Sequence, residues 1–565
     1  MEDPHQINPL ISFRLENVTP LSGHFYGLRQ RTLSLKASAA TDLQLTQFMS
    51  EFSERLRETL NCRGITKEPK LEDHGESYNL NVISFLELVA ALQEAGGGVV
   101  VEKPLIFHDY KSEHHDYLIL LPTINPNICS IATKGLYNIL LQATEYKTLE
   151  IGKYLEKMAM ALVNDILKVT PQATNPRHFI RAAYKLDIPH MFLTRDIIQF
   201  GYGHGSRLFN SSLTDETPAI GTSLVKNKQI SSNIMKRAGF PVPKQIGVSS
   251  VESAVNAAKK IGYPVVLKPS DQDMGRGVFS RIKTEDQLRS YFPKTFAISK
   301  NIIVEKHEEG ENYRVNVVKG KVVRAREQLG ARVIGDGRST IYQLIQRENQ
   351  DSRRGVGRFY DLSPIIINND LNEVLAAQHM SVNDIPKVGQ RVWLAHHTNA
   401  SQGGISLDRT NEIHPDNSDL CVRATQLFGL DISGIDIIIK DISKSYLDIG
   451  GAICEVNAQP QIMRNEPFIH EDILQGYVSS QPVIKISVLQ RGAIGNYRNI
   501  DEQLLDRNNK MIHLKAAVDV LLKLGLPVSY YNNIEFDAQV PHEDRDEIQR
   551  VFGALHKDIT YPKSI

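Results

Sequence analysis

The sequence predicts a multidomain α+β protein in which a mixed α/β N-terminal domain precedes a β-rich central domain. Three observations support this prediction. The chain has 565 residues, enough for several domains of about 150 residues each. Hydrophobic residues make up 41% of it, which is sufficient for packed cores. Amphipathic helical stretches alternate with short apolar runs of strand length.

The charge balance and the cysteines argue against several classes of protein. Lys and Arg together number 65, as do Asp and Glu, whereas proteins that wrap nucleic acid or coat anionic membranes normally carry surplus positive charge. The four cysteines form no CxxC pair, so neither a disulfide scaffold nor a zinc ribbon is expected. No apolar run approaches the ~20 residues that cross a bilayer, and no secretory signal is evident. We expect a cytoplasmic protein without nucleic-acid or membrane partners.

Residues 1–165 are predicted to form the N-terminal domain. Its patterns predict strands at 11–14, 33–35 and 99–101 and helices at 42–60 and 148–167. The polar stretch with His108, His114 and His115 is interpreted as a hairpin loop, since no zinc-ligand spacing accompanies these histidines. Residues 166–222 are predicted to be a connecting α/β segment with a helix at 176–185 and a strand at 188–194.

Residues 223–485 hold the most informative patterns. Helices are predicted at 226–238 and 252–261, and strands at 264–268, 301–306, 436–440 and 452–457, with two more around the turn at Lys319 and Gly320. Residues 486–565 are predicted to be a C-terminal extension of unknown role, with helices at 511–524 and 543–555.

Lys268 ends an apolar strand immediately before a polar loop that contains Gly275 and Gly277. Glycines let backbone N–H groups approach a ligand closely, and a lysine beside such a loop can neutralise phosphate oxygens. An ordinary hairpin with a surface lysine would have the same pattern. This stretch alone therefore leaves both interpretations open.

Asp436, Glu455 and Asn457 lie in two predicted strands near each other in the sequence. Residues two apart in a strand share a face, so Glu455 and Asn457 present two oxygens together. Two carboxylates and an amide form an oxygen-only ligand set, which suits Mg²⁺ bridging nucleotide phosphates better than zinc. A solvated strand face is the alternative. The apolar surroundings favour the metal site, because unpaired carboxylates there would be costly.

In this order, the motifs resemble those of the ATP-grasp superfamily, and within it the ATP-grasp module of cyanophycin synthetases. The resemblance covers roughly residues 170–480 in collinear stretches at 200–209, 264–278, 302–325, 331–345, 399–417, 429–441 and 455–462. It implies two α+β lobes that grip ATP. The N-terminal domain would take the place of that family's own N-terminal domain, where it could bind or present the acceptor.

The resemblance also implies roles for single residues. Lys228 and Lys268 are similar to the lysines that contact ATP, and Arg314 to the catalytic arginine that stabilises the acyl-phosphate and the tetrahedral intermediate. Asp436, Glu455 and Asn457 are similar to the Mg²⁺ ligands. The phosphate loop and the adenine hinge would comprise Asp271, Gly275, Arg276, Gly277, Glu305, Lys306, His307 and Asn312. The segment near the substrate carboxylate would comprise Asn399, Ser401, Gly403 and Gly404.

The implied activity is ATP- and Mg²⁺-dependent ligation of a carboxylate to an amine through an acyl-phosphate, with release of ADP and phosphate. Amino acids or peptides would be the substrates, and by analogy the protein would be a homo-oligomer. Such chemistry needs no side-chain nucleophile, and the sequence has no GxSxG motif. The sequence names neither the amino acid that is added nor the acceptor.

Two departures from the family pattern leave alternatives open. Cyanophycin synthetases carry a further Mur-ligase-like domain with a P-loop, which does not occur in this sequence, so a single ligation is expected. Met274 stands where the family's loop has a histidine. The alternatives are a glutathione-synthetase-like small-peptide ligase and a catalytically silent ATP-binding regulatory protein. Retention of all six lysine, arginine and metal-ligand positions argues against the silent protein.

Three further features of the sequence are not assigned a function. His396 and His397 are expected to be packed or solvent-facing, and Trp393 is expected in the core. The basic cluster of Arg353, Arg354 and Arg358 fits a solvated loop as well as a contact to an acidic substrate.

Overall fold

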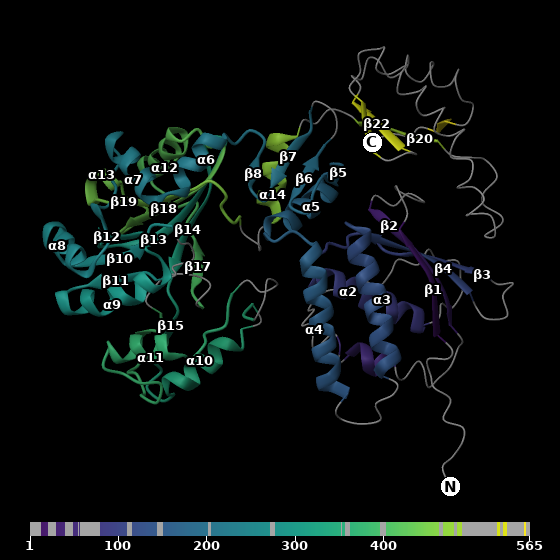
Figure 1. Cartoon of the computed structure of the whole chain (residues 1–565), viewed down its shortest axis with the longest axis horizontal. Helices are drawn as coiled ribbons and strands as arrows, with labels where there is room; N and C mark the ends of the chain where they lie inside the picture. The colour runs from purple at the N-terminus through teal and green to yellow at the C-terminus, as the bar shows by residue number, and fades with distance from the viewer. Residues whose placement is uncertain are drawn as a thin grey trace, which may run out of the picture. The chain divides into compact units, whose positions relative to one another are not determined.

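The computed structural model describes much of the chain, in stretches separated by gaps (Figure 1). The described residues are 13–20, 30–39, 49–54, 56, 80–109, 116–143, 151–201, 205–271, 277–351, 353–355, 362–395, 403–462, 467–478, 483–488, 528–531, 535–539 and 559–560. The chain forms two compact units, 1–208 with 470–565, and 209–469. Both contain helices and antiparallel sheets, which confirms the α+β class. The finer boundaries at residues 165, 222 and 485 stay predictions.

The first unit contains a four-stranded antiparallel sheet in the order β1-β2-β4-β3. Its strands are β1 (Phe13–Pro20), β2 (Arg31–Ala39), β3 (Leu105–Asp109) and β4 (Asp116–Thr123). β3 and β4 pair as the predicted hairpin requires, with His108 opposite Tyr117. His114 and His115 lie outside the described residues.

Helix α3 (Pro126–Ala143) packs against β1, β2 and β4 of this sheet. It also packs beside α2 (Leu80–Ala95) and α4 (Ile151–Val169), and the three helices run next to one another in Figure 1. α4 is the helix predicted at 148–167. Of the helix predicted at 42–60, residues 49–54 and 56 are described and are helical. None of the described helices is long and apolar enough to cross a membrane.

Residues 99–101, predicted as a strand, do not form one. The backbone N–H of Val100 donates to Glu94 Oε1 at 2.8 Å, and that of Val101 donates to Gln30 Oε1 at 2.8 Å. Because side chains satisfy these donors, the segment needs no partner strand despite its β-branched residues. The Glu94 carboxylate is in turn held by two arginines of α5 (Asn175–Lys185), Arg177 at 2.9 Å and Arg181 at 2.6 Å.

The remainder of the first unit consists of short elements. They are α5 (Asn175–Lys185), β5 (His190–Phe192), β6 (Ile197–Phe200), most of α14 (Pro467–Tyr477), β20 (Val483–Val488), β21 (Val528–Tyr531), β22 (Glu535–Gln539) and β23 (Ile559–Thr560). α5 and β5 correspond to the helix and strand predicted there. The last four strands form a sheet in the order β21-β22-β20-β23. The helices predicted at 511–524 and 543–555 lie outside the described residues.

A strand pair and two consecutive helices lie at the start of the second unit, with Arg207 and Leu208 of the first strand still in the first unit. These are β7 (Arg207–Asn210), β8 (Leu213–Thr214), α6 (Ala219–Lys226) and α7 (Lys228–Arg237). The helix predicted at 226–238 begins later than expected, because the Asn227 side chain accepts hydrogen bonds from the backbone N–H groups of Gln229 and Ile230. This cap makes Lys228 the first residue of α7.

A four-stranded sheet in the order β11-β10-β12-β9 forms the first lobe of this unit. Its elements are β9 (Gln245–Val248), α8 (Val251–Ile261), β10 (Val265–Pro269), β11 (Phe279–Ile282), α9 (Glu285–Ile298) and β12 (Ile302–Lys306). Residues of α8 and α9 share an apolar core with the strands, which include Val265, Leu267 and Val304. The strands predicted at 264–268 and 301–306 are confirmed as β10 and β12.

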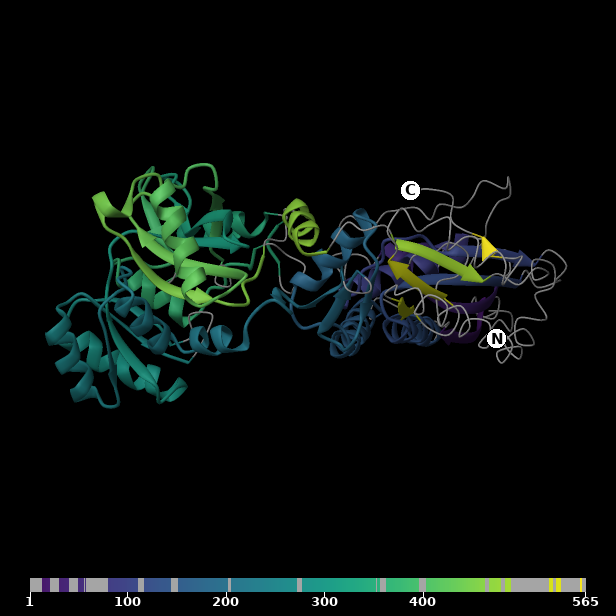
Figure 2. The ribbon, with the colours of Figure 1, turned by 90° about the horizontal axis from the view of Figure 1, so that it is seen from above.

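A five-stranded sheet in the order β17-β14-β13-β18-β19 forms the second lobe. Its elements are β13 (Glu311–Val318), β14 (Lys321–Leu329), β17 (Ile405–Asp408), α12 (Pro415–Leu427), β18 (Ile432–Ile439), α13 (Tyr446–Ile449) and β19 (Ala452–Asn457). Helix α12 covers β13, β14 and β18, and α7 packs on β19. In Figure 2 the two lobes are seen as adjoining teal and green bodies.

A smaller cluster lies between β14 and β17 in the sequence. It consists of β15 (Arg332–Ile334), α10 (Ile341–Asn349), α11 (Asn369–Ala376) and β16 (Arg391–Trp393), around a core of its own. Trp393 was predicted to be a core residue but is only half-buried. Its ring lies 5.7 Å from the guanidinium carbons of both Arg332 and Arg391, because these residues extend over it from the paired strands β15 and β16.

Candidate active site

The five-stranded sheet of the second unit has one apolar and one polar face. On β13, Tyr313, Val315 and Val317 pack into the core beneath α12. Arg314 and Asn316 alternate with these residues and therefore lie on the opposite face. This polar face carries the catalytic and metal-binding residues that the sequence predicts on β13, β18 and β19.

Arg314, Asp436 and Glu455 lie in one row across three neighbouring strands. Arg314 of β13 is paired with Asp436 of β18, which is paired with Glu455 of β19. The Arg314 guanidinium donates to both oxygens of the Asp436 carboxylate, from Nε to Oδ1 and from Nη2 to Oδ2 at 2.9 Å. Asn457 lies two residues further along β19, opposite Gly434. The structure therefore brings these four predicted residues together.

Two lysines approach this row from other elements. Lys228 Nζ, at the start of α7, lies 3.6 Å from Glu455 Oε1. Lys268 Nζ, on β10 of the first lobe, lies 2.9 Å from Glu305 of the adjacent strand β12. All four side chains are largely buried, with exposed fractions from 8% to 25%. Buried charges in such an arrangement need one another or a charged ligand.

The pKa shifts agree with this convergence. Burial raises the pKa of the Glu455 carboxyl, and repulsion from Asp436 adds to this effect, while attraction by Lys228, Arg314 and Lys268 opposes it. For Lys268, burial alone would lower the pKa of the ammonium, but attraction by Glu305, a hydrogen bond to Glu305 and attraction by Glu455 outweigh burial and raise it. Attraction between Lys268 and Glu455 thus links a side chain of the first lobe with the row on the second lobe.

A β-bulge interrupts β19, the strand that carries the predicted metal ligands Glu455 and Asn457. The pairing of β18 with β19 shifts between Asp436–Glu455 and Ile437–Ile453, which leaves Cys454 as the extra residue. Bulges re-aim side chains next to active sites. Burial, followed by repulsion from Glu305, raises the pKa of the Cys454 thiol, so it stays protonated beside the carboxylates. Sequence analysis missed Cys454, since nothing in its strand pattern marks a bulge.

The predicted adenine hinge, at the end of β12, is held by several hydrogen bonds. The Lys306 backbone N–H donates to the carbonyl of Lys244 at 2.8 Å, and that of His307 to the carbonyl of Pro264 at 3.1 Å. Lys306 Nζ donates to the carbonyl of Gly262 at 3.1 Å. Burial lowers the pKa of His307, so this imidazole is neutral near pH 7.

The remaining predicted residues are only partly described. Asp271 Oδ2 accepts a hydrogen bond from Asn301 at 2.9 Å, and Gly277 has a φ of +69°, where a side chain would be strained. Asn312 lies on β13 opposite Gln328. Other predicted residues lie outside the described part of the chain, namely Gly275, Arg276, Met274, Arg358, His396, His397, Asn399 and Ser401.

Gly403 and Gly404, at the described end of the predicted substrate segment, are buried. Gly403 has a φ of +85°, and a Cβ on it would lie 2.6 Å from Ile365 Cγ1. Its carbonyl accepts a hydrogen bond from Arg354 Nη1 at 2.8 Å, and the same nitrogen donates to the carbonyl of Ser363 at 2.9 Å. With 3% of its side chain exposed, Arg354 is buried and is not part of a solvated loop. Its two hydrogen bonds join Ser363 to this segment, and we call this arrangement the Arg354 clamp.

Replacing Arg354 by Gln should destabilise the protein and impair substrate binding, because two buried carbonyls lose a charged donor. We expect a loss of roughly 2 kcal/mol in the free energy of unfolding, measured with urea. If the segment binds a carboxylate substrate as the resemblance implies, the KM for that substrate should rise more than the KM for ATP. Arg353→Gln is the matched control, since the side chain of Arg353 is 61% exposed and pairs with Asp351. Equal unfolding curves for both variants would contradict the clamp.

The residues present fit a hard divalent cation. Glu455 and Asp436 repel each other at short range, and the buried Asn457 amide nitrogen has no hydrogen-bond partner within the described part of the chain. Since the amide's nitrogen and oxygen positions are assigned and not observed, the oxygen is equally able to face a cation. The described residues contain no group of three or more His, Cys, Asp or Glu side chains able to hold a metal alone. The carboxylates of Asp436 and Glu455 suit Mg²⁺, which needs one or two carboxylates besides phosphates and water.

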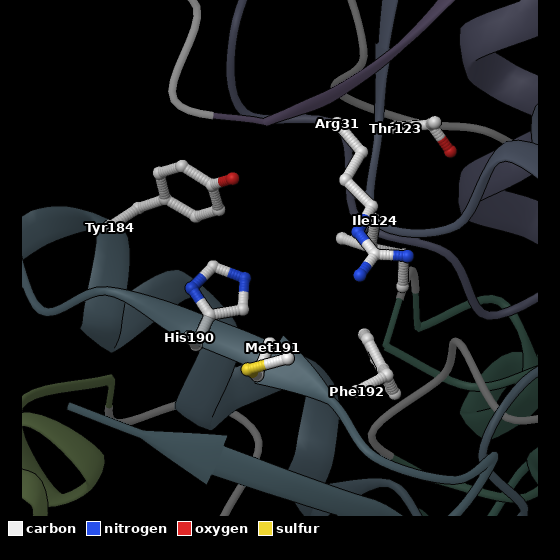
Figure 3. A pocket seen from close by; sticks show the side chains of 7 residues that line it. All are labelled: Arg31, Thr123, Ile124, Tyr184, His190, Met191 and Phe192. Carbon is white, nitrogen blue, oxygen red and sulfur yellow. The ribbon is translucent and has the colours of Figure 1, made fainter. Parts of the chain in front are cut away.

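A separate pocket lies within the first unit (Figure 3). Arg31 and Thr123, at the ends of β2 and β4, line it together with Tyr184, His190 and Met191. None of the residues predicted to bind ATP, metal or substrate lines this pocket, and the sequence analysis did not anticipate it.

Comparisons with known proteins agree with the sequence motifs. Residues 227–364 match the family described as carbamoyl-phosphate synthase L chain, ATP binding domain. A cyanophycin synthetase from Trichormus variabilis is 33% identical over 352 residues, which cover 58% of this chain and 39% of that protein. A bifunctional glutathione biosynthesis protein from Mannheimia succiniciproducens is 31% identical over 274 residues, covering 47% of this chain and 36% of that protein. The chain thus spans well under half the length of these relatives.

Among solved structures, a bifunctional glutathione synthetase from Pasteurella multocida is similar over 78% of this chain and 82% of its own, with 16% identity and a TM-score of 0.42. The relatives and the family match confirm the resemblance to cyanophycin synthetases that the motifs predict. They leave the roles of the individual site residues as predictions.

Proposed function

Since its central part is an ATP-grasp domain similar to that of cyanophycin synthetases, we propose that the chain is an ATP- and Mg²⁺-dependent carboxylate–amine ligase. A carboxylate oxygen attacks the γ-phosphorus of ATP, and ADP leaves. The acyl-phosphate formed is attacked by an amine, and phosphate leaves as the amide bond forms. Amino acids or peptides supply both groups, in keeping with the names of the relatives.

One observation carries this proposal. Arg314, Asp436 and Glu455 form a single row on the polar face of the sheet, and Lys228 reaches this row from another element. Lys268, on the first lobe, attracts the Glu455 carboxylate of this row. Phosphoryl transfer is catalysed mainly by fixed cations placed around the transferring group, which is what this arrangement supplies.

The chain's own residues would divide the work as follows. Lys228 and Lys268 would bind phosphate oxygens, exchanging part of their contact with Glu455 and Glu305 for the nucleotide. Arg314 would stabilise the charge on the acyl-phosphate and on the tetrahedral intermediate, with its guanidinium oriented by Asp436. Asp436, Glu455 and Asn457 would hold Mg²⁺, which when bound neutralises charge on the phosphates.

The test is release of ADP and phosphate by the full chain with Mg²⁺ and ATP, using the twenty amino acids and short peptides as substrates. We expect substrate-dependent formation of ADP and phosphate and a product whose mass corresponds to a new amide. Formation of AMP and pyrophosphate would contradict the acyl-phosphate route. The same screen separates a polymer-forming enzyme from a ligase that makes a single small peptide.

A small-peptide ligase of the glutathione-synthetase type is the second candidate, because one relative at 31% identity is a glutathione biosynthesis protein. A silent ATP-binding regulator would bind nucleotide but release no ADP with any substrate of the panel. A cytoplasmic location and a homo-oligomeric state are parts of the same proposal, and size-exclusion chromatography with light scattering tests the latter.

A further inference from the structure

Asn316 of β13 is a buried polar residue on the face of the sheet that carries the proposed site. It is 2% exposed, and it shares this face with Arg314, two residues earlier in the strand. Its Nδ2 atom is buried and has no hydrogen-bond partner within the described part of the chain. A buried amide that is left unsatisfied costs free energy, so its presence requires an explanation. Sequence analysis did not single out Asn316, because one uncharged polar residue among valines predicts no role by itself.

The residues paired with Asn316 on the two neighbouring strands offer its amide no side-chain acceptor. On β18 the paired residue is Gly434, which has no side chain. On β14 it is Arg324, which forms an ion pair with Asp408 at 2.8 Å. A guanidinium has hydrogen-bond donors and no acceptor. Neither paired side chain can therefore accept a hydrogen bond from Asn316 Nδ2.

Asn417, a second buried asparagine of the same unit, shows what a structural role looks like. It lies on α12 and is 0% exposed. Its Nδ2 donates to the carbonyls of Ile442 at 2.8 Å and Lys444 at 2.7 Å, and its Oδ1 accepts from the backbone N–H of Tyr446 at 2.9 Å. Both polar atoms of this amide serve the fold. The amide nitrogen of Asn316 makes no such bond within the described residues, which favours a role outside the fold.

A second hydrogen-bond donor lies beside the glycine that is paired with Asn316. A Cβ on Gly434 would lie 3.3 Å from Arg314 Nη1, and this nitrogen takes no part in the two hydrogen bonds to Asp436. Gly434 is also paired with Asn457 of β19, so Asn316 is in one row with a predicted metal ligand. Because Gly434 has no side chain, an amide and a charged guanidinium nitrogen border a position that no side chain of the row fills. Two such donors suit an oxygen that carries negative charge.

We infer that Asn316 is a further substrate-binding residue, whose Nδ2 donates a hydrogen bond to an oxygen of the carboxylate that is phosphorylated. Arg314 would bind the same group through Nη1. The ligand class is a carboxylate and the acyl-phosphate formed from it, since one carboxylate oxygen remains as a carbonyl acceptor after phosphoryl transfer. This inference rests on the proposed ligase function, and it adds a residue for which the sequence predicts no role.

Asn316→Leu separates a role in binding from a role in the fold. Replacing an unsatisfied buried amide by an apolar side chain of similar size removes a desolvation cost. The unliganded variant should therefore melt at the same temperature as the wild type or higher. Asn417→Leu is the matched control and should melt lower, because three hydrogen bonds are lost. A melting temperature for Asn316→Leu as low as that of Asn417→Leu would overturn the inference, because Asn316 would then be structural.

The kinetic test is steady-state ADP release by the full chain with a carboxylate substrate identified in the amino-acid and peptide screen. For Asn316→Leu we expect kcat/KM for the carboxylate to fall at least about tenfold, while the KM for ATP stays within about twofold. Asn316→Asp should be less active than Asn316→Leu, because its negative charge repels the substrate carboxylate. Lys321→Gln, an exposed change on β14, is the control for activity.

Two kinetic results would overturn the inference while the ligase function stands. One is an unchanged kcat/KM for the carboxylate in Asn316→Leu. The other is a higher activity of Asn316→Asp than of Asn316→Leu, because the side chain would then face a cation and not an anion. If no substrate supports ADP release, the ligase proposal itself fails.

Binding then tests Asn316 independently of turnover. The measurement is the thermal shift that the same amino acids and peptides produce with a non-hydrolysable ATP analogue and Mg²⁺. A shift of the wild type that is lost in Asn316→Leu supports the carboxylate site. Equal shifts in the two proteins, or no shift with any of these carboxylates, refute it.

Discussion

Glu455→Gln is expected to lose substrate-dependent ADP release by a factor of at least about 100, without loss of stability. Glu455 lies in the row of Arg314 and Asp436 and faces Lys228 at 3.6 Å. The neutral amide keeps the shape of the side chain but removes one of the two carboxylates proposed to hold Mg²⁺. The measurement is initial-rate ADP formation at saturating ATP, with Mg²⁺ varied so that weaker metal binding is seen as a higher Mg²⁺ requirement.

The stability of this variant follows from the direction of the Glu455 pKa shift. Burial raises that pKa above its ordinary value of 4.5 in the folded chain. Protonated Glu455 therefore stabilises the metal-free fold below pH 4.5, and this contribution disappears as the pH rises through the folded pKa. Gln cannot lose a proton, so at neutral pH the metal-free variant should melt no lower than the wild type.

The matched control is Glu311→Gln, which changes an exposed residue at the start of β13 and should leave both rate and stability unchanged. If Glu455→Gln turned over like the wild type, the proposed metal site would be wrong. A strongly lowered melting temperature would instead assign Glu455 a structural role, because the variant would then have removed a stabilising ion pair with Lys228.

The candidate site residues could be named from the sequence as predictions, but their arrangement could not. Asp436, Glu455 and Asn457 are polar residues in otherwise apolar strands, and this contrast makes them recognisable in the local sequence. The row that joins Arg314 to Asp436 depends on the pairing of strands 122 residues apart. It also depends on a bulge at Cys454, which no local pattern encodes. Register is a property of the whole sheet, so it required the structure.

Two wrong or incomplete predictions have one physical cause. Residues 99–101 have the composition of a strand, and Arg354 has that of a solvated loop. In the structure, side chains from elsewhere accept hydrogen bonds from the backbone N–H groups of Val100 and Val101. Likewise, the Arg354 guanidinium donates to the backbone carbonyl of Gly403, 49 residues away. Hydrogen bonds between residues far apart in sequence override local propensity in both places. Composition alone therefore misjudges segments whose polar groups are satisfied from elsewhere.

Arg314→Lys is expected to reduce the rate of ligation by at least about a hundredfold, with little change in the KM for ATP. Arg314 donates from Nε and Nη2 to the two oxygens of Asp436. The third nitrogen, Nη1, takes no part in these two bonds and lies beside Gly434. A lysine keeps the charge but lacks the planar fork, so it cannot bind Asp436 at two points and the reacting group at a third. Single-turnover formation of the acyl-phosphate and steady-state amide synthesis measure the two steps separately.

A second variant tests the same orientation without touching Arg314. A Cβ on Gly434 would lie 3.3 Å from both Cδ and Nη1 of Arg314 and 2.9 Å from Cβ of Pro460, so Gly434→Ala must displace the guanidinium or the proline ring. We expect Gly434→Ala to lower the rate in the same direction as Arg314→Lys, and the double variant to be little worse than either, because both disturb one group. Arg338→Lys, an exposed change, is the control. Fully additive losses would mean that Gly434→Ala acts on something other than Arg314. The proposed role of Gly434 in orienting the guanidinium would then be wrong.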